Sequence, residues 1–175
     1  TYYQQKKDYP KAIEYARRIF EFHKTRADTA AVKNWNNLFW QGLTALDMAA
    51  MRLEQGDLAA GEHYAALGYA LSRVSRADRG YSAWYAEFDA LQVLLSIKLK
   101  TGQLEESARL LQRSEELKKI LDQAPDLTPF RYLKFYSHRA RYSELRGEFD
   151  DAMQWTRKVE SLQDSLDRRN DARKF

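Results

Sequence analysis

The sequence predicts an all-α protein built from repeated antiparallel helix pairs, an α-solenoid. Its composition is helical, because Ala, Leu, Arg, Glu and Gln are abundant while 175 residues include only 3 Pro and 7 Gly. Four segments of the chain also align with one another without gaps. In each segment apolar residues recur at steps of three and four, which is the spacing of one face of an amphipathic helix.

The four aligned segments share the same side-chain types at the same positions. They begin at Lys7, Gly56, Gly102 and Gly147. Two residues after each start is a large apolar group, and these residues are Tyr9, Leu58, Leu104 and Phe149. Five residues after each start is a small one, and these residues are Ala12, Gly61, Ser107 and Ala152.

Each position has a physical role in a helix pair. Glycine at the start of a segment adopts positive φ easily and so ends the preceding helix, which we expect at Gly56, Gly102 and Gly147. In three of the four segments an acidic residue follows the first position, namely Asp8, Asp57 and Glu148, and it favours the start of the next helix. The small residue lets two helices approach closely. A leucine there would overpack the contact and destabilise the fold by roughly 1–3 kcal/mol.

Another helical stretch precedes each glycine. In the stretch FDALQVLLSIKLK, one stripe holds Phe88, Leu91, Leu95 and Leu99. Helix, tight turn and helix therefore recur along the chain, as in solenoid proteins. We expect one domain over residues 1–175, made of a partial repeat (1–26), three repeats (about 30–75, 81–122 and 129–165) and an exit helix to residue 175.

This pattern resembles the tetratricopeptide repeat (TPR), whose helix pairs form a right-handed superhelix. The family's small position in the first helix of each pair corresponds to Ala49, Leu95 and Ala140. The repeats here are long and divergent, because the segment starts are 49, 46 and 45 residues apart, against about 34 in the family. The first helix of a pair usually carries a late aromatic residue, and that position holds Arg52, Lys98 and Ser143.

The two ends of the chain differ from the repeats between them. The chain opens with Thr1 in mid-motif, and only TYYQQKK represents the first helix of the first pair. We therefore expect a piece of a longer protein, with an exposed apolar N-terminal face through which a homodimer could form. The closing stretch SLQDSLDRRNDARKF predicts an exposed helix that either caps the fold or connects it to a further module.

Composition and motifs favour a binding protein over an enzyme. The net charge of +4 is small, and basic and acidic residues alternate along the chain. We therefore expect no nucleic-acid partner. No Cys is present, the three His are not spaced as metal ligands, and no phosphate-binding or nucleophile motif occurs, so we expect no metal, cofactor or catalysis. No apolar run approaches the roughly 20 residues of a membrane span, so no membrane contact is expected within this chain.

The resemblance implies where a ligand would bind. Ligands of the family usually lie along the concave face made by the first helices of the pairs. Carried over by position, this implies a groove that includes Asp47, Gln92, Ser96, Lys134, His138 and Arg141. The last three form a basic end, where we hypothesise that an acidic or carboxylate group of a peptide docks. A plain solvated helix face is the competing interpretation of the same residues.

Two functional hypotheses follow from these observations. The long repeats and the exit helix resemble the extracytoplasmic TPR input domain of bacterial sensor histidine kinases, so the first is a sensory or scaffolding module of a two-component signalling protein. The second is a cytoplasmic TPR adaptor or peptide-responsive transcriptional regulator. About 20 apolar residues after Phe175 would favour the sensor, and their absence the adaptor.

Overall fold

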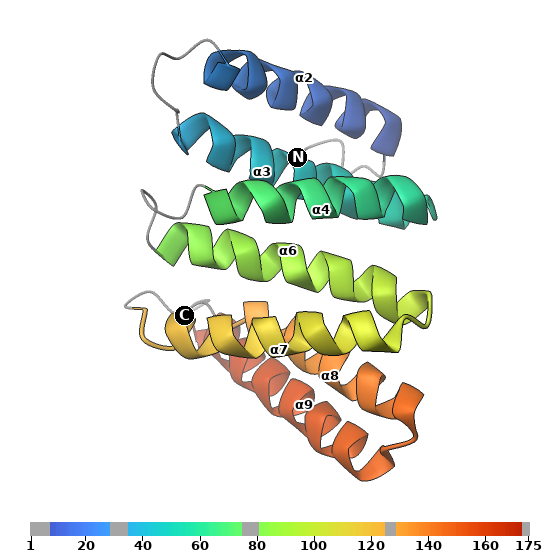
Figure 1. Cartoon of the computed structure of the whole chain (residues 1–175). Coiled ribbons are helices and arrows are strands. Elements are labelled where there is room, and N and C mark those ends of the chain that lie inside the picture. The colour runs from blue at the N-terminus through green and yellow to red at the C-terminus, as the bar shows by residue number, and fades with distance from the viewer. Residues whose placement is uncertain (1–7, 29–34, 75–80, 125–128, 173–175) are drawn as a thin grey trace. The chain divides into compact units, whose positions relative to one another are not determined.

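The computed structural model describes residues 8–28, 35–74, 81–124 and 129–172, and every regular element in these ranges is an α-helix. The prediction of an all-α fold is therefore confirmed for the described residues. Figure 1 labels the helices. They are α2 (Tyr9–Asp28), α3 (Trp35–Glu54), α4 (Leu58–Val74), α6 (Tyr81–Lys100), α7 (Leu104–Leu121), α8 (Arg131–Arg146) and α9 (Phe149–Ala172).

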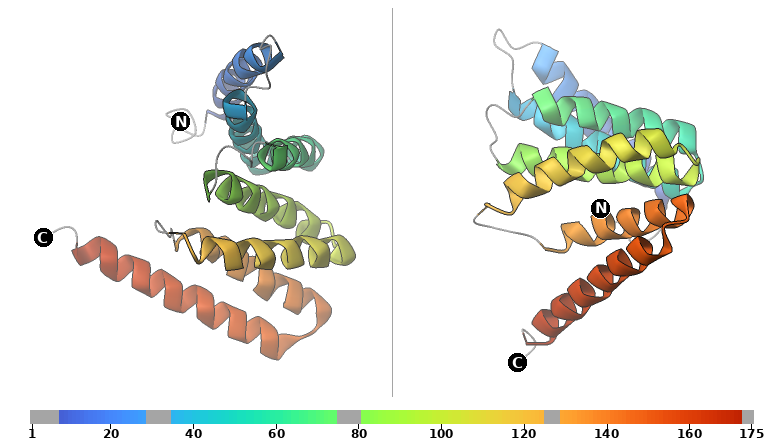
Figure 2. Two further views of the ribbon diagram at one scale, coloured as in Figure 1. Left: turned by 60° about the vertical axis from the view of Figure 1, so that its left-hand side comes forward. Right: turned by 60° about the horizontal axis from the view of Figure 1, so that its bottom comes forward.

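The chain divides into two compact units, Thr1–Ile97 and Lys98–Phe175, and each is described by itself. In the first unit α3 packs against both α2 and α4, as Figure 1 shows. In the second unit α8 packs against α9 and also touches α7. Both views of Figure 2 show α8 and α9 as neighbouring helices joined by a tight turn.

The same turn joins the two helices of each pair at three glycines. Gly56, Gly102 and Gly147 have φ of +80°, +70° and +76°, so each takes the predicted left-handed conformation. The next residue then donates its backbone N–H to the carbonyl five residues earlier, at 2.9 Å in every case. The donor–acceptor pairs are Asp57 to Arg52, Gln103 to Lys98 and Glu148 to Ser143. This bond is the mark of a Schellman motif, which satisfies carbonyls at the helix end.

Two of the acidic residues at the segment starts, Asp57 and Asp8, accept a backbone N–H at the start of a helix. Asp57 Oδ1 accepts the Ala60 N–H at 3.1 Å, which caps the start of α4. Asp8 Oδ1 accepts the Lys11 N–H at 3.4 Å, a longer contact at the start of α2. The start of α7 differs, because Gln103 makes no side-chain cap and the first turn instead carries Glu105 and Glu106.

Small residues lie where helices meet. Gly61, Ser107 and Ala152 are all buried. A Cβ on Gly61 would lie 2.9 Å from Leu53 Cδ2 of α3, closer than atoms can pack. The sequence expectation that Gly61 faces a neighbouring helix is therefore confirmed. In the second unit the Ser107 hydroxyl donates to the carbonyl of Gln103 at 2.9 Å, so its polar group is satisfied within α7.

The predicted stripe of α6 is buried as well. Phe88, Leu91 and Leu95 are fully buried and Leu99 is 5% exposed. At the C-terminus, α9 runs without interruption from Phe149 to Ala172, so the predicted exit helix is a continuation of the last repeat helix. Both ends of the chain lie outside the described residues. These ends are residues 1–7, which include the segment start at Lys7, and residues 173–175.

Candidate functional site

Three of the groove residues implied by the resemblance lie in the first unit. Asp47 of α3 reaches solvent, yet crowding by protein atoms disfavours its charged form and raises the pKa of its carboxyl group. Ser96 of α6 is partly buried. Gln92 is only 3% exposed, and its amide donates to the Phe88 carbonyl at 3.3 Å. Gln92 therefore presents little polar surface to a ligand.

The other three groove residues lie on α8, in the second unit. Lys134 and Arg141 are exposed, and Arg141 Nη1 donates to Glu144 Oε2 at 3.0 Å on the same helix. His138 is partly buried, and burial together with the charge of Lys134 lowers its pKa to about 4. At neutral pH His138 is therefore uncharged, and the hypothesised basic end is weaker than the residue types imply.

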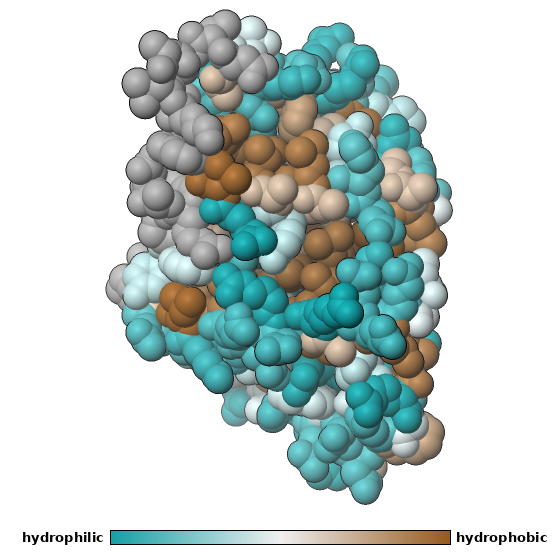
Figure 3. Space-filling model, viewed as in Figure 1, coloured by the Kyte–Doolittle hydropathy of each residue, from teal (hydrophilic) through white to brown (hydrophobic). Residues whose placement is uncertain are grey.

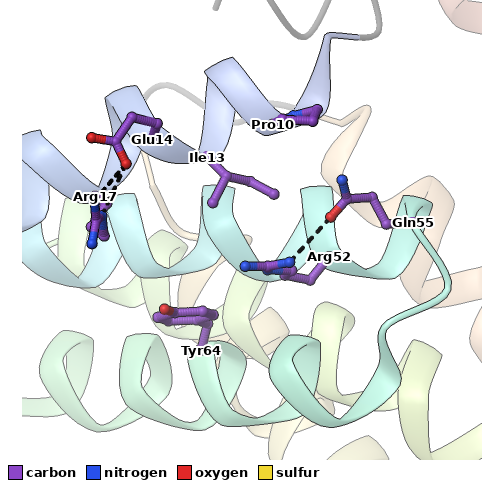
Figure 4. A pocket seen from close by; sticks show the side chains of 7 residues that line it. All are labelled: Pro10, Ile13, Glu14, Arg17, Arg52, Gln55 and Tyr64. Atoms are coloured by element: carbon purple, nitrogen blue, oxygen red, sulfur yellow. Dashed lines mark hydrogen bonds and ion pairs between the residues drawn. The ribbon is translucent and has the colours of Figure 1, made fainter.

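A cavity that the sequence did not predict lies among α2, α3 and α4, in the first unit. Its volume is about 490 Å³, which is within the range of about 300–1,000 Å³ that small ligands occupy. Figure 4 shows Ile13 and Arg17 extending from α2 toward Arg52 of α3 and Tyr64 of α4. The lining residues are Pro10, Ile13, Glu14, Arg17, Arg52, Gln55 and Tyr64.

Arg52 is the cation of this cavity that the protein holds least firmly. Its Nη1 lies 3.4 Å from Gln55 Oε1 and 3.7 Å from Asp57 Oδ2, which are both long contacts for a guanidinium. Its Nε is buried and finds no hydrogen-bond partner among the described residues. The side chain is 34% exposed, so it lies close to solvent while part of its donor capacity is unused.

Arg17 is held more firmly than Arg52. Its Nη2 lies 2.6 Å from Glu14 Oε2, and Arg18 Nε lies 3.2 Å from Glu14 Oε1. These two hydrogen bonds lower the pKa of Glu14, which therefore stays ionised. One carboxylate thus serves two guanidinium groups, and the charged residues that line the cavity are one anion, Glu14, and two cations, Arg17 and Arg52.

The basis of this cavity was only partly visible in the sequence. Arg52 occupies the position where the TPR family usually has an aromatic residue, so the departure from the family was itself the indication. Tyr64 lies eight residues after Gly56, where every aligned segment has a bulky side chain, and that spacing does not mark a binding site. Pro10, Ile13 and Glu14 carried no pattern, because they come together only when α2 packs on α3.

A second polar and aromatic cluster surrounds Trp155 of α9. The ring of Tyr136 stacks on it at 5.7 Å between centroids, and Arg139 and Lys158 lie 4.7 and 3.7 Å from its centroid. Arg139 also bonds Glu115 of α7 at 2.9 Å. These contacts connect α7, α8 and α9 through cation–π and ionic interactions, which is a structural role.

Two further sets of polar side chains make contacts within or between helices. His23 Nδ1 lies 2.9 Å from Asn37 Oδ1, and the ring of His23 stacks on Trp40. Glu116 pairs with Arg113 at 2.8 Å. Within the described ranges, no group of three or more His, Asp or Glu is arranged to hold a metal ion. In the same ranges no helix has the length and apolarity to cross a membrane.

Hydrophobic side chains are also visible at the surface of the first unit. Figure 3 shows them interleaved with hydrophilic ones over α2 and α3. On α2 the side chains of Tyr15 and Phe22 are each 52% exposed, and the guanidinium of Arg26 lies 4.4 Å from the ring centroid of Phe22. The exposed apolar N-terminal face expected from the sequence stays a prediction, because residues 1–7 lie outside the described residues.

Comparison with known proteins identifies no relative. No protein-family description, no curated protein and no solved structure matches this chain. The geometry of the described residues is therefore the basis for a functional proposal.

Proposed function

We propose that the chain is a non-catalytic TPR-like module that binds a peptide or protein segment. The observation that carries this proposal is the recurrence of one turn geometry at Gly56, Gly102 and Gly147. Each turn joins two helices, as in the repeat units of solenoids, which stack into a right-handed superhelix in the TPR family. Such arrays expose long helix faces and grooves, and their usual task is recognition.

The cavity among α2, α3 and α4 supports the binding role. It combines apolar walls, from Pro10 and Ile13, with a few polar groups that converge on the same space. Ligand sites commonly have this combination, since the apolar part supplies affinity and the polar groups fix orientation. The ion pairs described above, such as Arg113 with Glu116 and Arg139 with Glu115, lie along or between helices.

We further propose that the module is the extracytoplasmic sensory domain of a signal-transduction protein, in particular a two-component sensor histidine kinase. The support is α9, a continuous helix of 24 residues that extends to the end of the described chain. A ligand that binds one conformation of the helical array better than another would shift the position of such a helix. The sequence that follows Phe175 tests this, because an adaptor would have no membrane span there.

Selection from a random-peptide library on the immobilised whole chain tests the binding role. The proposal predicts enrichment of peptide families that compete with one another in solution. Failure of any sequence family to rise above the background of a heat-unfolded sample would reject it.

A further inference from the structure

We propose that the cavity among α2, α3 and α4 binds the carboxylate of an acidic side chain in a peptide, with Arg52 as the principal contact. This inference rests on the peptide-binding function proposed above and names its ligand chemistry. None of the residues that line the cavity belongs to the groove that the family resemblance implied. Its evidence is the incomplete engagement of Arg52 and the composition of the cavity wall.

The charges at the cavity favour an anion. Among the residues that the structure describes, Arg52 has long contacts to Gln55 and Asp57, at 3.4 and 3.7 Å, and its buried Nε finds no hydrogen-bond partner there. A guanidinium is a planar fork of donors that fits a carboxylate with two parallel hydrogen bonds. A ligand carboxylate would therefore supply the close acceptors that Arg52 lacks in the free protein. A small rotation of the partly exposed side chain would bring Nε into the same interaction.

One lining residue, Glu14, is an anion among the cations of the cavity, and it favours a carboxylate ligand over phosphate. Glu14 lines the cavity and stays ionised because Arg17 and Arg18 bond to it. It repels a dianion more strongly than a monoanion. A phosphate site would be expected to present several cations without such a carboxylate.

The uncharged part of the wall fits a peptide. Pro10 and Ile13 give an aliphatic surface, Tyr64 presents an aromatic ring with a hydroxyl group, and Gln55 adds an amide that can both donate and accept. An acidic side chain flanked by aliphatic residues matches this arrangement, with the carboxylate at Arg52 and a neighbouring side chain against Ile13. The volume of about 490 Å³ holds more than one side chain.

Two synthetic peptides with blocked ends test the inference: Gly-Leu-Glu-Leu-Gly and its counterpart with Gln in place of Glu. Their affinities for the whole chain are measured by amide chemical-shift titration. The Glu peptide should bind roughly tenfold more tightly, as expected for a charge-assisted contact, and should shift the amide signals of Ile13, Arg52 and Tyr64. Arg52→Gln should abolish the preference, and Arg52→Lys should keep part of it, because charge remains without the fork.

Lys98→Gln is the matched control. It removes one positive charge at the same position of the next repeat, from a residue that does not line the cavity, and should leave the preference intact. Equal affinity for the two peptides, binding of neither, or a preference that survives Arg52→Gln would overturn the inference. Inorganic phosphate that shifts the same amides more strongly than the Glu peptide would overturn it in favour of a phosphate site. The shift map of the unmutated chain decides the matter if Arg52→Gln does not fold.

The two proposals can fail separately. If the random library yields binding peptides but the Glu and Gln peptides bind alike, the chain is a peptide-binding module whose ligand is not recognised through Arg52. If the library yields no binding peptide, the binding function fails and this inference fails with it.

Discussion

Gly42 of α3 and Gly68 of α4 face each other so closely that the backbone of Gly42 crowds the space that a side chain at position 68 would need. A Cβ on Gly68 would lie 3.0 Å from the carbonyl oxygen of Gly42, and a Cβ on Gly42 would lie 3.4 Å from that of Gly68. The same Cβ on Gly68 would lie 2.7 Å from Leu46 Cδ2. This approach sets how tightly the helix pair can close.

Gly68→Ala should therefore lower the free energy of unfolding. Overpacking costs about 1–3 kcal/mol, and the better helix propensity of alanine returns roughly 1 kcal/mol, so a net loss of about 1 kcal/mol is expected. Gly42→Ala should cost less, since its nearest contact, Leu71 Cβ, would lie at 3.2 Å. Denaturant unfolding of the two variants measures the difference.

The control for this pair is Ala70→Gly, at an exposed position of α4. It changes only helix propensity and should destabilise by roughly 1 kcal/mol. If Gly68→Ala proved more stable than the unmutated chain, the close approach of α3 and α4 would be refuted.

Gly147 gives a test of the turn that is independent of packing. Its φ is +76°, and a Cβ there would meet nothing within 4 Å in the described part of the chain. Gly147→Ala should lower the free energy of unfolding by about 1 kcal/mol through backbone strain alone. Gly147→Asn should lower it less, because asparagine tolerates the left-handed conformation. Thermal unfolding of both variants measures the two losses. Equal losses for alanine and asparagine would contradict a left-handed turn at position 147.

His138 should make the protein less stable in mild acid. Its pKa is about 4 in the folded chain against an ordinary value of 6.5, so between these values the unfolded chain binds more protons. Stability from this residue is then complete above about pH 6.5 and falls as the pH drops toward 4, by at most about 3 kcal/mol. His138→Gln should flatten the dependence of unfolding free energy on pH over this interval. An equal slope in both proteins would contradict the burial of His138.

Asp47 should change the stability with pH in the opposite direction to His138. Its folded pKa is raised above 3.8 by desolvation, so the folded chain binds more protons than the unfolded chain just above that value. Stability from Asp47 is therefore lost as the pH rises through its folded pKa. Asp47→Asn should stabilise the chain near neutral pH, with a gain that shrinks toward about pH 4. A loss of stability at neutral pH would show that Asp47 makes a favourable contact instead.

The helices and their turns could be predicted from the sequence because both depend on local chemistry. Glycine at positions 56, 102 and 147 marked the left-handed turns, and the spacing of Phe88, Leu91 and their partners marked the buried stripe of α6. Leu95 is the exception, because it is fully buried where the family has a small residue. How far the stacked pairs follow the family's right-handed superhelix stays a prediction.

The candidate site could be predicted only in part, because its properties depend on packing. Residue type suggested a charged His138, but burial and Lys134 hold it neutral. Gln92 was expected to face a groove and instead bonds to the carbonyl of Phe88. The cavity around Arg52 requires three helices to converge, and no single segment of the sequence contains that information.

The central claim is that the chain binds a peptide at one defined site among its helices. Its most direct test is an amide chemical-shift titration of the whole chain with the peptide family enriched from the random library. The account predicts saturable shifts confined to one contiguous set of helix residues, with Arg52 and Tyr64 among them. Shifts that never saturate, or that are scattered over all the helices alike, would contradict it.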